Sequence, residues 1–482
     1  MKMRIKVKNI ICLCTLGAAF SASADTLYWV DTKTFNSTYN QNSPRYLLST
    51  EKSSEEGNDN YNWATGFSLD GDGKPTYTYA ETVYAPTADT DVILDYSKNA
   101  FTYQMGGSMV LNANQTFSIK SLAISGCNNN WAMFNMQTSS HFQISGDLTY
   151  GFNGYVRFTS GNLSVGGDIY NNNTNGYNNL SLGAATSSLE SFSAENVYLS
   201  RGNGNSMITF SVGRAATTYD KATGVIRGVI DFGSNAGKVR FEKMADFEQF
   251  LKVGGLKGSA GTVTAEAAGV NYTVVLTNPS EQTYSGVVTN AEGASVNIVM
   301  DGAATQVLSG ENSFSGYIQM ENGTLLAKTA AGSTHGKLTL NGGRFGAVGN
   351  AAVSSAEFNG GGFIFADKDE FLAGAGVSLI SIAGEFAKTA SDKIAIDFNG
   401  LDASELVGIT YDLITAGSLT GMSSEVDADE YFAAENLLNA VADFGWNGNM
   451  LQVTFGTVPE PAGVAALLGL AAFAFAARRR RG

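Results

Sequence analysis

The amino-acid sequence predicts an all-β chain folded as a right-handed parallel β-solenoid (β-helix) with short helical interruptions. Its 482 residues are enough for one long repetitive body. Glycine is frequent (56), proline is rare (6) and aromatic residues are plentiful (28 Phe, 20 Tyr), a balance that suits many short strands joined by tight turns. Strand-like phrases also recur along the chain, and such units bury a core only by stacking, at about 4.8 Å per coil.

The N-terminal segment is typical of a secretory signal peptide. Basic residues at positions 2–8 precede an apolar stretch at 10–20 and an Ala-Ser-Ala sequence at 22–24, which is an A-x-A cleavage pattern. We expect the Sec translocon to export the chain and signal peptidase to cut after Ala24, with Ala22 and Ala24 as recognition residues. Two of the three cysteines fall within this segment, so Cys127 has no partner for an intrachain disulfide.

The C-terminal segment combines a proline motif, an apolar run and a basic cluster. The run occupies residues 462–477 and measures roughly 24 Å as a helix, which is short against a hydrocarbon core of about 30 Å. The basic cluster should hold the last residues on the cytoplasmic side, so we expect transient insertion into the inner membrane with the body facing outward. The motif and the cluster consist of Pro459, Glu460 and Pro461, and of Arg478, Arg479, Arg480 and Arg481.

This segment resembles the PEP-CTERM sorting signal, which has a Pro-Glu-Pro motif, one hydrophobic helix and a terminal arginine cluster. The resemblance covers only the last two dozen residues. It implies that an exosortase, an integral membrane protease-transpeptidase, recognises Pro459, Glu460 and Pro461 and removes the tail. Delivery to the cell surface or extracellular matrix of a bacterium with an outer membrane would follow. The resemblance carries no information about the activity of the exported body.

Internal repetition is the main signal in the body. The motif Thr-Tyr-Ser-Gly at 283–286 recurs thirty residues later as Ser-Phe-Ser-Gly at 313–316, each followed by an alternating run, at 296–300 and at 323–327. This spacing predicts one copied unit. Residues 307–333, reading VLSGENSFSGYIQMENGTLLAKTAAGS, resemble the autotransporter-associated β-strand repeat, with its aromatic-x-Gly turn. From the whole pattern we expect about 20 coils and a rod of roughly 80 to 100 Å.

The repeat pattern continues through residues 338–366, where glycine turns allow positive φ and phenylalanines point inward. The turns are Asn341-Gly342-Gly343 and Asn359-Gly360-Gly361, and the phenylalanines are Phe345, Phe358, Phe363 and Phe365. Four earlier phrases predict the same architecture with more irregular loops: 118–125, 142–150, 163–170 and 192–199. Equivalent places in three of them hold Gly146-Asp147, Gly167-Asp168 and Glu195-Asn196.

These patterns also predict two helices, two closing strands and a division of the chain into five segments. Helices are expected near 244–251, where apolar residues have helical spacing, and near 431–441. Residues 410–421 and 446–455 resemble closing strands. The segments are a signal peptide at 1–24, an N-terminal β-rich cap region at 25–100, an irregular β-solenoid at 101–270, autotransporter-type repeats and closing strands at 271–456, and the sorting signal at 457–482.

Few residues favour metal binding. His141 and His335 lie in Ser/Thr-rich settings without ligands at metal spacing, so we expect both in surface turns. The sequence Asp-Gly-Asp-Gly-Lys at 70–74 imitates the opening of a calcium loop, but Lys74 replaces the third ligand and an acidic surface turn is preferred. We therefore expect no metal and no cofactor.

Catalytic motifs are also scarce. No G-x-S-x-G, H-E-x-x-H or P-loop pattern occurs in the sequence. The carboxylate pairs Asp89 with Asp91 and Asp367 with Asp369 can serve acid–base catalysis only if the fold brings them onto one groove. We name no catalytic residue.

The formal net charge of −14 opposes contact with phosphate backbones and anionic lipid, so no nucleic-acid partner is expected. Exopolysaccharide and neutral glycans remain possible partners. We prefer a non-enzymatic structural or adhesin-like protein of the cell surface or matrix. The alternative is a β-helix carbohydrate-active enzyme, a polysaccharide lyase or hydrolase, whose site would cluster Arg or Lys with Asp on one strand face. Here Arg157, Arg201 and Arg214 occur singly.

Overall fold

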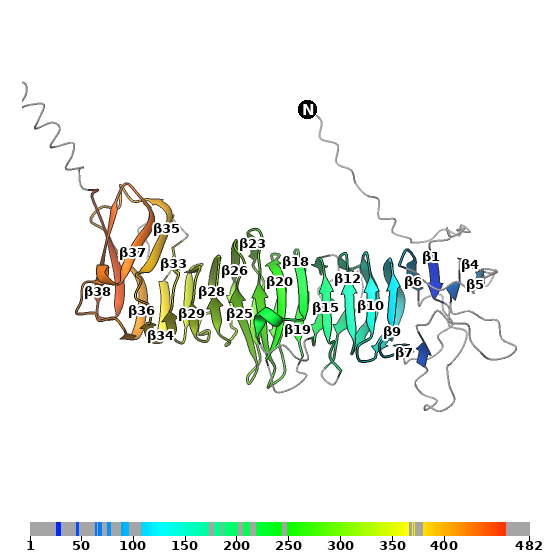
Figure 1. Cartoon of the computed structure of the whole chain (residues 1–482). Helices are drawn as coiled ribbons and strands as arrows, with labels where there is room; N and C mark the ends of the chain where they lie inside the picture. The colour runs from blue at the N-terminus through cyan, green and yellow to red at the C-terminus, as the bar shows by residue number, and fades with distance from the viewer. Residues whose placement is uncertain are drawn as a thin grey trace, which may run out of the picture.

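A computed structural model describes residues 26–29, 45–47, 63–64, 66–69, 75–78, 88–95, 108–172, 178–184, 187–200, 206–212, 218–242, 248–365, 369, 371 and 379–458. Most of these residues lie in short strands that stack side by side into an elongated body (Figure 1). Nearly all pairings between strands are parallel, an arrangement consistent with a β-solenoid. The stack as a whole is therefore all-β, as predicted.

The strands of the first half are β1 (Thr26–Trp29), β2 (Arg45–Leu47), β3 (Trp63–Ala64), β4 (Gly66–Leu69), β5 (Pro75–Thr78), β6 (Asp91–Asp95), β7 (Ser108–Leu111), β8 (Thr116–Ile119), β9 (Ser121–Met136), β10 (His141–Ile144), β11 (Leu148–Thr159), β12 (Asn162–Val165), β13 (Ile169–Asn171), β14 (Asn178–Leu182), β15 (Ser191–Ala194), β16 (Val197–Tyr198), β17 (Ser206–Phe210), β18 (Gly224–Asp231), β19 (Lys238–Phe241) and β20 (Gln249–Lys257). A short 3₁₀ helix, η1 (Tyr219–Lys221), precedes β18.

The strands of the second half are β21 (Thr262–Ala265), β22 (Asn271–Leu276), β23 (Gln282–Tyr284), β24 (Val287–Asn290), β25 (Ser295–Met300), β26 (Thr305–Asn312), β27 (Ile318–Met320), β28 (Thr324–Thr329), β29 (Leu338–Leu340), β30 (Arg344–Ala347), β31 (Asn350–Val353), β32 (Ala356–Phe358), β33 (Gly362–Ile364), β34 (Leu379–Lys388), β35 (Ile394–Asp402), β36 (Thr410–Thr420), β37 (Phe432–Leu438), β38 (Val441–Asn447) and β39 (Met450–Gly456). A second 3₁₀ helix, η2 (Ala428–Glu430), precedes β37.

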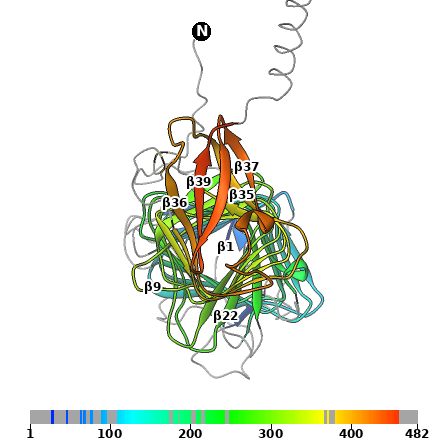
Figure 2. The ribbon, with the colours of Figure 1, turned by 90° about the vertical axis from the view of Figure 1, so that its left-hand side faces the viewer.

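Three parallel ladders run along the stack and surround a common interior (Figure 2). Ladder 1 passes through β8, β10, β12, β15, β18, β20, β22, β25, β27, β29, β32, β34 and β36. Ladder 2 passes through β1, β6, β9, β11, β13, β16, β18, β20, β23, β26, β28, β30, β33, β35 and β37. Ladder 3 begins with β2, β7, β9, β11, β14, β17, β19, β21 and β24.

The body is shorter than the sequence predicted. Within the described residues, ladder 2 holds fifteen strands, which at about 4.8 Å per step gives roughly 67 Å in place of 80 to 100 Å. Coil length varies, because Leu338 pairs with Ala356 after 18 residues whereas Leu163 pairs with Phe192 after 29. Long coils use up sequence without adding height, so the estimate of about 20 coils was too large.

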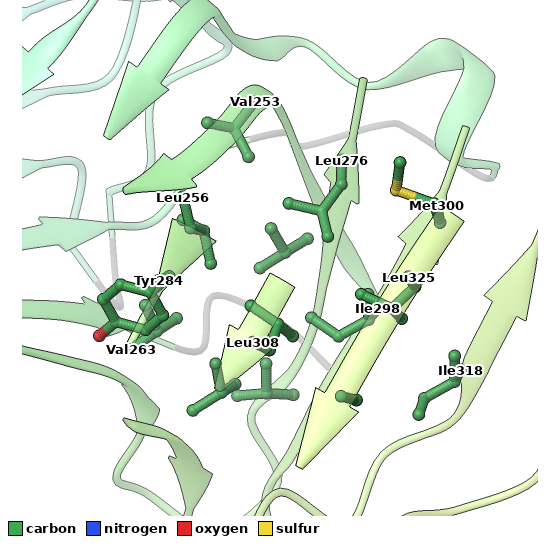
Figure 3. Packing of buried hydrophobic residues seen from close by; sticks show 14 of the residues in the cluster. Val253, Leu256, Val263, Leu276, Tyr284, Ile298, Met300, Leu308, Ile318 and Leu325 are labelled. Atoms are coloured by element: carbon green, nitrogen blue, oxygen red, sulfur yellow. The ribbon is translucent and has the colours of Figure 1, made fainter. Parts of the chain in front are cut away.

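A single apolar cluster fills the interior from Val92 to Phe455. Alternate residues point inward, as β28 shows with its regular change between half-buried and buried positions. Figure 3 shows side chains from several coils, among them Leu276, Ile298 and Ile318, meeting in this interior. Each fully buried Leu, Ile or Phe contributes about 1.5–3 kcal/mol.

Aromatic rings stack along the interior from coil to coil. The rings of Phe134 and Phe158 lie 4.4 Å apart and nearly parallel, and those of Phe241 and Tyr272 lie 4.1 Å apart. The predicted inward phenylalanines Phe345, Phe358, Phe363 and Phe365 are all buried. The predicted glycine turns are also confirmed, because Gly343 and Gly361 have φ of 62° and 75°.

The strand-like phrases at 142–150 and 163–170 pair in the predicted register. The predicted repeat of thirty residues, however, differs from the number of residues in one coil. Phe142 pairs with Leu163, and Gly167 N donates to Gly146 O. In contrast, Thr283 pairs with Val307, only 24 residues later. The predicted copy at 313–316 follows β26 and lies beside β24, where Thr289 and Ser313 share a hydrogen bond of 2.8 Å. The two runs expected to be equivalent, 296–300 and 323–327, belong to ladder 1 and to ladder 2.

The aromatic-x-Gly motif has a steric origin. A Cβ added to Gly286 would lie 2.4 Å from the ring of Tyr284 and 2.5 Å from the carbonyl oxygen of Gly261. Real Cβ atoms essentially never make non-bonded contacts this short, so glycine allows the buried ring and the neighbouring coil to approach together. The motif therefore marks a close approach of two coils.

The two expected helices are strands in the structure. Residues 249–257 form β20 in place of a helix at 244–251, of which 244–247 lie outside the described residues. Residues 431–441 contain β37 and the start of β38. In both segments the parallel backbone pairing with the preceding coil outweighs the local helical spacing, as Val253 with Ile226 and Ala433 with Ala395 show.

The C-terminal end of the stack has antiparallel pairing, which involves the segments 410–421 and 446–455. β39 lies between β36 and β38, with Thr410 opposite Thr454 and Val441 opposite Gly456. This change of direction ends the parallel stack. Among the residues that the structure describes, no helix is long and apolar enough to span a bilayer; the expected sorting helix at 462–477 lies outside them.

His335 is a core residue, which corrects the expected surface turn. Its side chain is fully buried, its ring stacks on Phe314 at 4.0 Å, and its Nδ1 bonds the Phe314 carbonyl oxygen at 2.8 Å. Burial lowers the pKa of His335 below its usual 6.5. The Ser/Thr-rich sequence around it gave no apolar signal. His141, in contrast, is exposed at the start of β10.

Gln306 supplies a hydrogen-bonding pattern that a backbone normally provides. Its fully buried side chain accepts from Leu256 N at 3.0 Å and donates to Leu256 O at 3.0 Å. Leu256 belongs to β20, two coils earlier in ladder 2. The amide also accepts from Asn278 Nδ2 at 3.0 Å. One side chain therefore satisfies buried polar groups that would otherwise lack partners.

We expect the stability of the protein to depend on the protonation of His335. Below about pH 6.5 the unfolded chain binds a proton that the folded chain resists, so the free energy of unfolding falls, by up to about 2 kcal/mol at pH 5. Chemical denaturation of wild type and His335→Gln at pH 5 to 8 measures this. The stability advantage of wild type should shrink at low pH. The control His141→Gln retains His335, so its free energy of unfolding should fall at low pH as that of wild type does. If the difference in stability between wild type and His335→Gln stayed the same from pH 5 to 8, protonation of His335 would not be the cause.

Replacing Gln306 by leucine should lower the free energy of unfolding by about 2–4 kcal/mol. The reason is that the buried N–H and C=O of Leu256 lose their partner, at about 1–3 kcal/mol for each group. Urea denaturation followed by circular dichroism measures the change. Gln115→Leu, at an exposed position, serves as the control, and equal losses in both variants would refute the role of the Gln306 amide.

Candidate functional site

The residues predicted to direct export lie outside the described part of the chain. This holds for Ala22, Ala24, the motif Pro459, Glu460 and Pro461, and the arginines Arg478, Arg479, Arg480 and Arg481. The acidic sequence at 70–74 and Asp367 also lie outside it. The last described residue is Val458, two residues beyond β39.

The described carboxylates do not assemble a metal site. Within the ranges given above, no group of three or more His, Cys, Asp or Glu side chains is placed to hold an ion. Asp91 accepts from Lys120 Nζ at 3.0 Å and from Ser121 Oγ at 2.5 Å, so it joins the first coils of ladder 2. This partner set points to a structural role for Asp91.

A column of hydrogen-bonded polar side chains lies at the corner between ladder 1 and ladder 2. Asp147 Oδ1 accepts from Asp168 N at 2.9 Å, and Asp168 Oδ1 accepts from Asn196 N at 3.1 Å. Asn196 Oδ1 in turn accepts from Val229 N at 2.9 Å. The equivalence of these positions was predicted, and each side chain caps the backbone of the next coil. The corner is therefore part of the scaffold.

One shallow groove lies on the outer face of ladder 1, and we call it the neutral groove. It has a volume of about 250 Å³, its floor is formed by β10, β12 and β15, and Ala222, Thr223 and Val225 line it from the next coil. None of the twelve described residues that line it is Asp, Glu, Lys or Arg. Its outward side chains form two rows along the stack: His141, Asn162 and Ser191, and Gln143, Ser164 and Ser193.

Hydrogen bonds fix these rows. Ser191 Oγ donates to Asn162 Oδ1 at 2.6 Å, and Ser193 Oγ donates to Ser164 Oγ at 3.1 Å. Asn162 Nδ2 donates to the carbonyl oxygen of Ser140 at 3.1 Å and to Glu190 at 3.2 Å. Glu190 thus lies beside the groove with its carboxylate already engaged. The groove offers hydroxyl, amide and imidazole groups on a rigid sheet.

A second polar cluster lies further along ladder 1, around Glu248. The Glu248 carboxylate accepts hydrogen bonds from Thr273 Oγ1, from Tyr317 OH at 2.7 Å and from Asn297 Nδ2 at 3.2 Å. Burial raises the pKa of the Tyr317 phenol, and its bond to Glu248 adds to this shift. The phenol therefore stays protonated near neutral pH and acts as a donor.

The segment around η1 lies against the outside of the sheet next to this cluster, where Lys252 Nζ donates to Asp220 O at 3.2 Å. Val275 and Val299 are fully buried although they do not belong to the interior cluster. Tyr219 of η1 is hydrogen-bonded to Glu321, and burial, with the charges of Glu321 and Asp301, raises the pKa of its phenol. These contacts attach the η1 segment to the outside of the stack, where it also borders the neutral groove.

Sequence patterns did not reveal either outer-face site. Six of the twelve groove residues lie in the predicted phrases 142–150, 163–170 and 192–199. Their side-by-side register, however, requires coil lengths of 21 and 29 residues. The alternation of polar and apolar residues in 141–144 and 162–165 was the available signal. Glu248 lies next to a segment that was predicted to be helical, so its contacts with Thr273 and Tyr317 had no basis in the sequence.

Comparisons with known proteins identify no relatives. No family model matches the chain, no curated protein matches it, and no solved structure matches it. The groove and the stack that carries it are therefore the main structural guides to function.

Proposed function

We propose that this chain is an exported structural or adhesin-like protein of the cell surface or extracellular matrix, without catalytic activity of its own. The observation that carries the proposal is the long parallel stack, which presents rows of uncharged polar groups on a rigid outer face. Its signal-peptide pattern and its resemblance to PEP-CTERM substrates support export, exosortase processing, transient inner-membrane insertion and surface delivery. Exopolysaccharide and neutral glycans are the proposed partners.

The proposed handedness of the solenoid is right-handed. Parallel strands of one sheet joined by a crossover are right-handed in about 98% of cases. Each coil of this chain is such a crossover, since it leaves a ladder and returns to it in parallel, as from Leu338 to Ala356. The fold is thus proposed to be a right-handed β-helix.

The alternative function is that of a β-helix carbohydrate-active enzyme, a polysaccharide lyase or hydrolase. The Glu248 cluster favours it, because carboxylates, two tyrosines and Lys252 lie on one outer face. Against it, the Glu248 carboxylate already accepts hydrogen bonds from three side chains of three different coils. The raised pKa values of Tyr219 and Tyr317 also keep both phenols protonated. A phenol of raised pKa is a poor general base. We therefore prefer attachment of the covering segments as the role of this cluster.

Replacing Pro459 and Pro461 by alanine should retain the full-length chain in the inner membrane. The change removes the residues on which recognition by an exosortase is proposed to depend. Membrane fractionation and mass spectrometry of the C-terminal peptide measure the outcome. Pro279→Ala, in an exposed turn, is the control and should be processed as wild type. Surface delivery of a normally trimmed double variant would refute the sorting assignment.

The purified protein should release no reducing ends from acidic or neutral polysaccharides. Assays with pectate, alginate, xylan and β-glucan test this expectation. Glu248→Gln is the matched variant, because it keeps the shape of the side chain and removes its charge. Turnover by wild type that the substitution abolishes would establish the enzymatic alternative.

A further inference from the structure

We propose that the neutral groove binds a short stretch of an uncharged, extended polysaccharide. This inference rests on the proposed function and assigns the surface through which that function is exerted. The groove faces outward on ladder 1, with His141, Gln143 and Ser164 exposed. A polymer can therefore reach it from the side of the stack.

The chemistry of the lining selects uncharged ligands. Hydroxyl and amide groups both donate and accept hydrogen bonds, as the hydroxyls of sugars do. The lining offers no Lys or Arg to pair with a uronate or a phosphate, and the net charge of −14 repels polyanions. A neutral glycan needs no cationic partner and is not repelled by the negative charge of the protein.

The step from strand to strand along each row is close to the length of one sugar unit in such a polymer. Gln143, Ser164 and Ser193 follow one another in register on successive strands, at roughly 4.8 Å per step. This rise is close to the length of one pyranose unit in an extended β-1,4-linked chain. Each sugar laid along the stack can therefore lie over one strand and meet one of its outward polar side chains.

The rows are ordered before any ligand binds. Ser191 and Ser193 are hydrogen-bonded to the preceding coil, and the strands beneath them are fixed by the buried side chains of Phe142, Leu163 and Phe192. Binding to an ordered surface loses less conformational entropy than binding to a mobile one. The groove thus has the rigidity that recognition of a weakly interacting ligand requires.

The size of the groove limits what it holds. Its volume of about 250 Å³ is below the roughly 300–1,000 Å³ of pockets that enclose small molecules. The residues Ala222 and Thr223, next to η1, border it in the direction of the C-terminus. It therefore holds a few sugar units of a chain that continues into solvent.

Isothermal titration calorimetry of the full chain tests the proposal. The probes are hexasaccharides of β-1,4-glucan and β-1,4-mannan, with hexagalacturonate as the acidic comparison. Binding to at least one neutral probe and none to the acidic probe is expected. Ser164→Trp fills the groove and should abolish binding, and Gln143→Ala should weaken it about three- to tenfold by removing one hydrogen-bonding group.

Thr283→Trp is the matched control, because Thr283 is exposed on ladder 2 away from the groove; it should bind as wild type. Circular dichroism melts check that the variants fold. Failure of both neutral probes, preference for the acidic probe, or unchanged binding by both groove variants would overturn the assignment.

The outcomes separate this inference from the proposed function. An inactive surface protein whose groove variants bind as wild type would refute the groove and leave the function standing. Cleavage of a glycan would refute the non-enzymatic function, whereas loss of binding in Ser164→Trp would still support the groove.

Discussion

The inward side chains of each coil share one apolar interior with the coils on either side, and that constraint governs the rest of the structure. A single coil has one inward row per ladder and no second layer to cover it. Backbone pairing in register therefore has to persist along the body. The Tyr284–Gly286 motif and the Gln306 amide both serve this persistence, one by allowing coils to approach and the other by completing their hydrogen bonds.

The same constraint explains what the outer faces can carry. Inward positions are fixed by packing, whereas outward positions vary without loss of the core. Ladder 1 shows two results of that freedom. Near β12 its outer side chains are uncharged and open to solvent. Near β22 the outer Thr273 bonds Glu248, and further along Glu321 bonds Tyr219 of the η1 segment. A uniform scaffold thus supports different surfaces at different heights.

Sequence reasoning was effective for features that depend on local pattern. Alternation, glycine turns and the equivalence of Asp147, Asp168 and Asn196 gave the fold class and several registers. It failed where pairing between distant segments decides the outcome. The helical spacing at 244–251 yielded to pairing with β18, and burial of His335 depends on Phe314. The neutral groove was unpredictable for the same reason, since unequal coil lengths bring its residues into register.

The antiparallel closure has a mechanical consequence. The chain leaves the described body just after β39, which is flanked by β36 on one side and β38 on the other. Tension applied at Val458 would run along β39 and load hydrogen bonds to both neighbours in shear, so that the bonds along the strand share the load. A pull across the strand would instead peel these bonds apart one at a time. This end of the body therefore resists a pull along β39 better than a pull across it.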